Sequence, residues 1–245
     1  MKRVLALVAV IVVVIGCFWF AWRRPSAPQR DALHTREIAT RGLAEHLARV
    51  FPGRRALVIS NPFTQESNLP REMRDMEEAG LRGLKQGFGD NIKLGAVGFP
   101  TLKPEAKDNP RAVFIDPETT TPLSYLVADD AFDKLAQQYP DCDLIVSLIG
   151  LPANLRSVQC WQNQDGPKFA LLPPDLRVIG DRAAMRRLLE SGKLAAFVLA
   201  KPSAAGTKPL STEEFKTDFE RLFLLVTREN AEASLQAFPQ LFPAN

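Results

Sequence analysis

The hydrophobic pattern is strongest in Asp143–Pro152, which reads DLIVSLIGLP. This stretch is continuously apolar and of strand length, begins with Asp and ends in Gly-Leu-Pro. A strand that is apolar on both faces is typical of a parallel sheet covered by helices on both sides. We therefore expect this segment to be the central strand of a doubly wound α/β sheet.

Strand-like and helix-like patterns alternate on both sides of this segment. Further strands are expected at Ala56–Ser60, Asn91–Phe99, Phe169–Leu172, Leu194–Ala200 and Leu222–Thr227, with a short edge strand at Arg111–Asp116. Helical spacing predicts helices at Asp31–Phe51, Glu72–Phe88, Asp129–Tyr139, Asp181–Ser191, Ser211–Arg221 and Asn230–Phe238, with a short one at Pro152–Val158. This alternation predicts a single α/β domain over residues 54–245, a mostly parallel three-layer sandwich.

An unbroken apolar run from Val4 to Trp22 precedes the domain, with basic residues at both of its ends. A helix of about 19 residues, rising about 1.5 Å per residue, nearly matches the hydrocarbon thickness of a bilayer. We expect residues 1–24 to be an N-terminal transmembrane anchor or signal segment. Residues 25–53 are then a linker and a juxtamembrane helix.

Two other interpretations of the N-terminal segment remain open. Val14–Cys17 resembles the lipobox of bacterial lipoproteins, in which the cysteine, here Cys17, becomes lipidated. The basic start and apolar centre also suit a cleaved signal peptide. The aromatic stretch Phe18–Trp22 continues the apolar run, which favours an uncleaved, single-pass anchor. All three interpretations place the domain outside the bacterial cytoplasmic membrane, facing the periplasm or the exterior.

The composition and motifs argue against catalysis, metal binding and nucleic-acid binding. The net charge is only +3 and no basic stripe is present, which argues against a nucleic-acid partner. The chain has no G-x-S-x-G, P-loop, G-x-G-x-x-G or H-E-x-x-H motif. Its two histidines, His34 and His46, are too far apart for helical metal ligands, and we expect both on the surface. We expect no enzymatic activity, no catalytic or metal site and no cofactor.

A group of carboxylates is the remaining candidate for chemistry, because paired carboxylates cleave glycosidic bonds in some enzymes. The simpler interpretation is a solvated loop followed by acids at a helix start. The residues concerned are Asp116, Glu118, Asp129, Asp130 and Asp133.

Cys142 and Cys160 are expected near the same edge of the sheet. In an oxidising compartment, a disulfide between them would close a loop of about 18 residues and contribute about 3 kcal/mol. The alternative is two buried or half-buried thiols.

The strand order predicts where a ligand would bind. Open α/β sheets hold ligands outside the carboxyl ends of their strands, where the strand order reverses. With the order 2-1-3-4-5, this point lies between the first and the central strand. The residues expected there and at neighbouring strand ends are Ser60, Asn61, Phe63, Thr101, Gly150 and Lys201. The alternative is that these residues only turn the chain.

Three passages carry a resemblance to a known family: Gly83–Gly98, Phe132–Pro152 and Arg186–Pro202. Each is a helix, a tight turn and a strand. Their order is similar to one lobe of the type I periplasmic binding protein fold, which is shared by sugar- and amino-acid-binding proteins and by bacterial regulators. The resemblance covers about residues 54–201, and it implies a lobe that takes part in solute binding.

Members of that family bind ligand between two similar lobes, whereas this chain has length for one lobe and an anchor. A single lobe leaves most of a small ligand exposed, and such sites depend on enclosure for their affinity. We therefore expect a non-catalytic, membrane-anchored extracytoplasmic binding or interaction domain, in an envelope complex with another protein or a second copy. The alternative is a solute-binding or sensing accessory protein of a transport system, with a small-molecule ligand at the strand ends.

Overall fold

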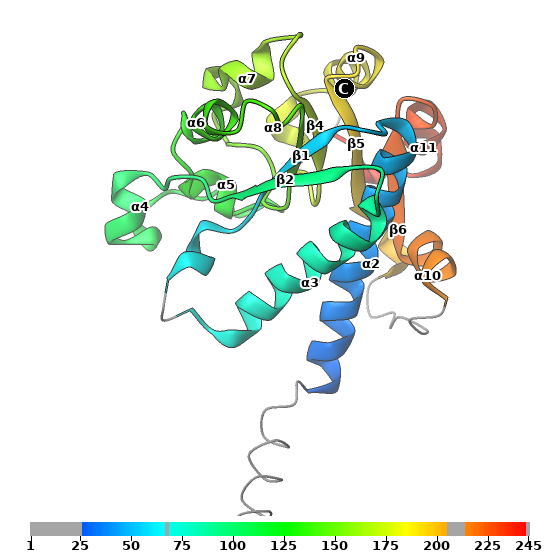
Figure 1. The fold of residues 1–245 in the computed structure, drawn as a ribbon, viewed down its shortest axis with the longest axis horizontal. Coiled ribbons are helices and arrows are strands. Elements are labelled where there is room, and N and C mark those ends of the chain that lie inside the picture. Colours follow the sequence, from blue (N-terminus) through cyan, green and yellow to red (C-terminus); the bar gives the residue numbers. More distant parts are fainter. Residues whose placement is uncertain (1–25, 67–68, 205–213, 244–245) are drawn as a thin grey trace, which may run out of the picture.

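The computed structural model describes residues 26–66, 69–204 and 214–243 (Figure 1). The expected anchor at residues 1–24, including Cys17, lies outside this part of the chain. No helix within the described part is long and apolar enough to cross a membrane.

A six-stranded sheet forms the centre of the fold, in the order β2-β1-β3-β4-β5-β6. Its strands are β1 Arg55–Ile59, β2 Lys93–Gly98, β3 Leu144–Ser147, β4 Lys168–Leu171, β5 Leu194–Ala200 and β6 Phe223–Thr227. The first five strands are parallel, and β6 pairs antiparallel with β5. The mostly parallel α/β sheet and its order around the first and central strands are thus confirmed.

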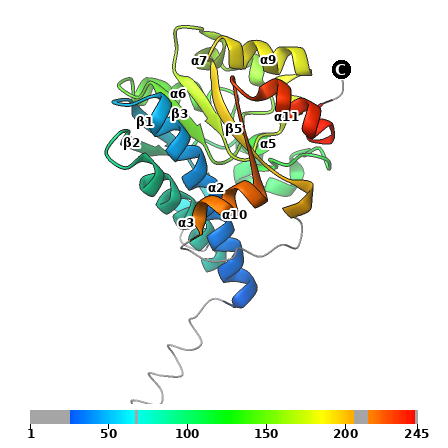
Figure 2. The same cartoon turned by 90° about the vertical axis from the view of Figure 1, so that its right-hand side faces the viewer.

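Helices cover both faces of this sheet (Figure 2). One face carries α2 Ala27–Val50, α3 Arg71–Phe88 and α10 Phe215–Leu222. The other carries α6 Ala131–Gln138, α7 Gln159–Gln162, α8 Leu176–Ile179, α9 Arg182–Glu190 and α11 Ala231–Ala237. Two short helices, α4 Pro104–Asp108 and α5 Leu123–Leu126, lie between β2 and α6, and single 3-10 turns occur at Pro62–Gln65, Pro110–Ala112, Leu155–Ser157, Pro202–Ala204 and Pro239–Leu241.

The pleat of β3 explains its continuously apolar sequence. Ile145 packs into the core on the α6 side, whereas Leu144 and Val146 pack into the core on the α2 side. Successive side chains of a strand point to opposite faces, and here both faces are covered. The strand itself is shorter than expected because the chain turns at Gly150, whose carbonyl accepts a hydrogen bond from Ser147 Oγ.

The prediction of an edge strand at Arg111–Asp116 was wrong. This segment contains a 3-10 turn at Pro110–Ala112, capped by Asn109, and then an irregular stretch. It does not extend the sheet, and Phe114 is 79 % exposed. A different short pairing occurs nearby, an isolated antiparallel bridge between Leu102 and Val127.

The expectation that both histidines lie on the surface was wrong for His46, which is 7 % exposed. It lies in the last turns of α2, and its Nδ1 is 3.2 Å from Arg49 Nη2. Burial, reinforced by the charge of Arg49, lowers the pKa of His46 from its ordinary value of 6.5. His34 is half-buried on the same helix.

The buried His46 predicts a loss of stability in mild acid. Because its folded-state pKa lies below 6.5, the unfolded chain binds the proton more readily, and stability falls as the pH drops from 6.5 through the folded pKa. One such group contributes at most about 1.4 kcal/mol per pH unit. Urea unfolding between pH 7.5 and 5 should show a shallower pH dependence for His46→Gln than for the native chain. Equal slopes for the two proteins would contradict this prediction.

Candidate functional site

The carboxyl ends of the parallel strands lie at one edge of the sheet, and the expected site residues follow these strands. The structure does not bring all of them together. Lys201, at the end of β5, is engaged beside β6: its Nζ donates to the carbonyl of Glu220 at 2.5 Å and lies 5.7 Å from the ring centroid of Phe238. The expected role of Lys201 as a cation for a ligand in the crevice is therefore not supported by its position.

The polar groups after β1 are occupied by local hydrogen bonds. Asn61 Oδ1 accepts from Phe63 N at 3.0 Å, which caps the 3-10 turn at Pro62–Gln65. Ser60 Oγ donates to Glu77 Oε2 of α3 at 2.5 Å. Ser60 and Asn61 are both buried. The hydroxyl of Ser60 and the side-chain oxygen of Asn61 are therefore used within the protein.

Residues 101–128, which we call the cap segment, cover the carboxyl ends of the central strands. The two ends of the segment are joined by hydrogen bonds from Ala128 N to Thr101 O at 2.9 Å and from Lys103 N to Leu126 O at 2.8 Å. The cap segment contains α4 and α5 and projects from the edge of the sheet (Figure 1). The expected site residue Thr101 thus contributes its backbone to the base of this segment.

The cap segment packs closely on the turn after β3. Gly150 has φ +84°, and a Cβ atom at this position would lie 2.6 Å from Thr121 Cγ2. A side chain there would be strained and would collide with the cap segment. Thr121 and Ser124 are both buried, and the carbonyl of Ser124 accepts from Ala153 N at 3.3 Å. Gly150 therefore serves close backbone packing at this place.

A second set of contacts ties the cap segment to the loop after β4. Thr119 Oγ1 donates to Asp175 Oδ2 at 2.7 Å, and Arg177 Nη2 lies 2.8 Å from the same oxygen. Arg177 Nη1 reaches Asp116 and Glu118, each at 3.2 Å. Burial opposes ionisation of Asp175, but the hydrogen bonds from Arg177 and Thr119 outweigh it, so the pKa of Asp175 is lowered. These contacts fix the cap segment over β4 as well as β3.

The carboxylate group considered above is dispersed among structural contacts. Asp116 and Glu118 pair with Arg177, as described. Asp133 accepts from the backbone amides of Gln159 and Cys160, at 2.9 and 2.6 Å, at the start of α7. Among the described residues, no group of three or more His, Cys, Asp or Glu side chains is placed to hold a metal ion.

Cys142 and Cys160 are free thiols in the structure, one buried and one half-buried, which is the second of the two alternatives for this pair. Their surroundings differ. Cys142 Sγ lies against β2, where a Cβ at Gly95 would be only 2.5 Å from it, whereas Cys160 lies at the start of α7 beside Asp133. Burial raises the pKa of Cys142, and burial together with Asp133 raises the pKa of Cys160 to about 12. Neither thiol has the lowered pKa that a nucleophilic cysteine needs.

Several cavities lie on the described part of the chain, and one of them reaches the carboxyl ends of β4 and β5. Five of them have volumes between about 370 and 590 Å³. None of these five is lined by Ser60, Asn61, Thr101, Gly150 or Lys201. At the switch point, the cap segment covers the β3 side, where Thr121 packs on Gly150. The sequence did not predict this contact. Within residues 101–128 only the run Thr119–Pro122 stands out, and the residues against which this run packs follow β3 and β4, far away in the sequence.

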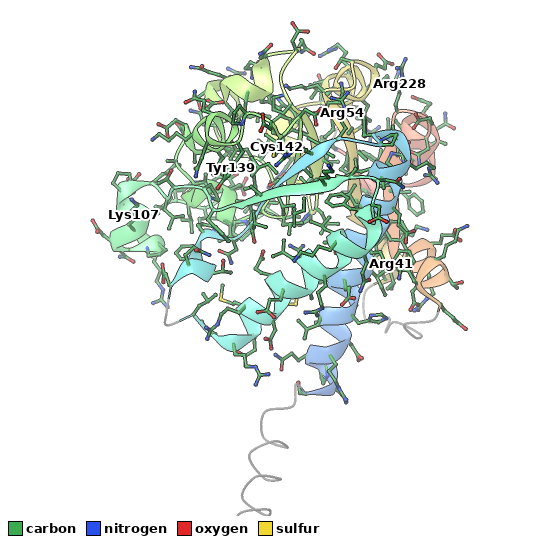
Figure 3. The ribbon with its side chains drawn as sticks, viewed as in Figure 1. Arg41, Arg54, Lys107, Tyr139, Cys142 and Arg228 are labelled. Carbon is green, nitrogen blue, oxygen red and sulfur yellow. The ribbon has the colours of Figure 1, made fainter. Side chains whose placement is uncertain are left out.

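The outer face of the cap segment is the part that remains accessible. Phe114 is the most exposed of the three large apolar side chains that stand out on the described surface, the others being Val50 and Met73. Exposed Lys107 and Arg111 lie on the same segment. Figure 3 shows Lys107 on α4, at the outer end of the segment.

Comparisons with known proteins give likenesses of structure alone. No protein-family model and no curated protein matches the chain. A carbohydrate transporter solute-binding protein from Agrobacterium radiobacter, solved with D-arabinose, has 15% identity and a TM-score of 0.48, over 85% of this chain and 63% of its own. A sugar transport substrate-binding protein from Bordetella parapertussis has 12% identity and a TM-score of 0.48, over 86% and 61%. A galactofuranose-binding protein has 10% identity and a TM-score of 0.45, over 84% and 63%.

The matching structures are solute-binding proteins of sugar transporters, with the type I periplasmic binding protein fold that the sequence resemblance named. This chain spans less than two thirds of the length of each of them. With TM-scores below 0.5 these likenesses carry no further argument. The α/β fold of this chain is established by its strand order and its two helical layers.

Proposed function

We propose that this protein is a non-catalytic interaction domain of the bacterial cell envelope. Its N-terminal apolar segment holds it on the outer side of the cytoplasmic membrane, and the outer face of the cap segment contacts another envelope protein. The observation that carries this proposal is the covered turn after β3: Thr121 of the cap segment is buried and packs on Gly150, beside the place where an open α/β sheet takes a ligand.

The accessible face of the cap segment supports a protein partner. Isolated exposed aliphatic residues are common, but an aromatic side chain that is 79 % exposed, as Phe114 is, gains most by insertion into a partner's pocket. Charged side chains of both signs are also exposed on the same segment, among them Lys107, Arg111, Glu105 and Asp108. Such charges steer association and fix its orientation more than they add affinity. We therefore expect a protein partner with an apolar pocket for Phe114, bordered by charged side chains of both signs.

Site-specific photo-crosslinking of the full chain in its own membrane tests the proposal. A benzoylphenylalanine at Arg111, three residues before Phe114 in the sequence, should form one adduct of defined mass. Phe114→Ser in the same protein should abolish it, because the anchoring side chain is lost. The same crosslinker at exposed Asp90, which follows α3 at the opposite edge of the sheet, is the control and should form none.

Two results would contradict the proposal. One is an adduct at Arg111 that persists with Phe114→Ser or is matched by the adduct at Asp90. The other is a saturable rise in melting temperature of the full chain with a sugar, an amino acid or a nucleotide, which would indicate solute capture instead. Intact mass of the membrane-extracted protein separately tests the anchor, because it distinguishes a retained Met1 from cleavage or lipid attachment at Cys17.

A further inference from the structure

A cavity of about 370 Å³ lies between the first half of α2, α3 and the carboxyl ends of β4 and β5. Its lining is aliphatic or aromatic except for Thr35 and Arg36; the apolar side chains include Ala39, Met76, Leu172, Val198 and Phe223. The volume is within the range of small-molecule sites. The cavity does not involve the cap segment, so it is separate from the surface proposed above.

The side chain of Arg36 is half-buried, and its guanidinium has few partners within the protein. Its side chain is 13 % exposed, and Nη2 donates to the carbonyl of Leu148 at 3.2 Å. Glu77 Oε1 is 4.0 Å from Nη2, which is beyond hydrogen-bond distance, and the other oxygen of Glu77 accepts from Ser60. An arginine carries five N–H donors, so most of those of Arg36 lack a close acceptor.

The electrostatics of this position favour an additional anion. Burial lowers the pKa of Arg36, with Glu77 opposing the shift, but an arginine stays charged at neutral pH. A buried charge is costly unless it is paired and hydrogen-bonded. A carboxylate forms two parallel hydrogen bonds with a guanidinium, and this is the strongest common pairing of that kind. An anionic group next to Arg36 would therefore satisfy donors that the protein leaves without a partner.

The other residues that line the cavity determine which kind of molecule fits beside Arg36. A sugar placed here would leave its hydroxyl groups without partners, because Thr35 and Arg36 are the polar side chains of the lining. Each buried hydroxyl without a partner costs about 1–3 kcal/mol. A hydrocarbon chain instead gains from contact with Met76, Val198 and Phe223. The lining thus favours a ligand with one anionic end and an apolar body.

We propose that this cavity binds a small amphiphilic carboxylate, with its carboxylate on Arg36 and its hydrocarbon chain against the ends of β4 and β5. The placement agrees with the general position of ligands in open α/β sheets, outside the carboxyl ends of the strands. Because α2 forms one wall and directly follows the N-terminal apolar run, the site lies on the element closest in sequence to the expected anchor.

Calorimetric titration of the full chain in phosphatidylcholine nanodiscs, with empty nanodiscs subtracted, tests the site. The probes are sodium octanoate, 1-octanol and octylammonium chloride, which share one chain and differ in charge. We expect saturable 1:1 binding of octanoate, at least tenfold weaker binding of octanol, and none of octylammonium. Arg36→Gln should reduce octanoate affinity at least tenfold and leave octanol unchanged, because one charge-assisted pairing contributes about 1.5–3 kcal/mol.

A second pair of variants keeps the test decisive if Arg36→Gln does not fold. Ala32 is exposed at the wall of the cavity, and Ala32→Trp should block octanoate binding. Ala27→Trp, at the exposed start of the same helix and outside the cavity, should bind octanoate like the native chain. Equal affinity for octanoate and octanol, or octanoate binding that Ala32→Trp leaves intact, would overturn the proposal. Neither outcome bears on the crosslink at the cap segment, so the two proposals fail independently.

Discussion

Replacing Gly83 by valine is expected to lower the free energy of unfolding by about 3 kcal/mol or more, the upper end of the cost of overpacking. Gly83 lies where α3 crosses α2. A Cβ atom there would be 2.2 Å from Thr40 Oγ1 and 2.3 Å from the carbonyl oxygen of Glu37. The second of these atoms is backbone, so a rotamer change cannot relieve the overlap and the two helices must separate.

Urea unfolding of the full chain in a mild detergent, followed by circular dichroism, measures this effect. Lys85→Val is the matched control, because it places valine on the exposed face of the same helix, two residues further along. It should change stability by about 0.5 kcal/mol or less, the usual range for surface positions. If Gly83→Val and Lys85→Val unfold at the same urea concentration, the close contact of α2 and α3 does not contribute as described.

Replacing Lys193 by methionine is expected to cost about 3 kcal/mol, although methionine keeps most of the side-chain volume. Lys193 is 2 % exposed, and its Nζ donates to the carbonyls of Cys160, Asn163 and Pro167 at 2.7, 2.6 and 3.0 Å. The ammonium thereby joins the loop after α7 to the start of β5. Methionine cannot donate, so these carbonyls lose a charged partner in a buried place.

Lys168→Met is the control for this substitution. Lys168 begins the neighbouring strand β4, is half-buried, and its Nζ donates to one carbonyl, that of Gly192, at 3.3 Å. We expect it to cost about 1 kcal/mol, the contribution of a single hydrogen bond. The same urea unfolding measurement compares the two variants. A cost for Lys193→Met no larger than that for Lys168→Met would show that the three-carbonyl arrangement is not a major support of the fold.

The buried cation Lys193 and the half-buried cation Arg36 illustrate different uses of a charged residue. The ammonium of Lys193 has acceptors for all three of its donors, which indicates a structural role. The guanidinium of Arg36 has one close acceptor and lines a cavity. The share of N–H donors that have an acceptor within the protein, more than burial, distinguishes the structural cation Lys193 from the candidate binding residue Arg36.

The sheet was predictable because its information is local. Each strand is a short apolar stretch between turn residues, and Leu144, Ile145 and Val146 are apolar on both faces because both faces are buried. The alternation of strands and helices then restricts the connections to a parallel, doubly wound order. Helix ends were nearly as predictable from the sequence. Asp181 caps α9 through its side chain, as its place in the sequence indicates.

The candidate site was only partly predictable. The strand ends were found, but Lys201 turns toward α10 and α11, and Ser60 is taken by Glu77. A side chain's direction depends on partners that are remote in sequence, and no spacing encodes them. The burial of His46 was missed for the same reason, because the neighbours that cover a helix face are supplied by the fold.

The amino-acid sequence by itself determined the mostly parallel α/β sheet, the main helices and the edge of the sheet where a ligand would be sought, since hydrophobic periodicity and turn residues act over a few positions. The tertiary structure alone decided that the cap segment covers the turns after β3 and β4 at this edge. Thr121 meets Gly150, and Thr119 meets Asp175, across separations of about 30 and 56 residues in the chain. The same is true of the cavity at Arg36, whose walls come from α2, α3, β4 and β5. Such contacts exist only once the sheet has brought its strand ends together.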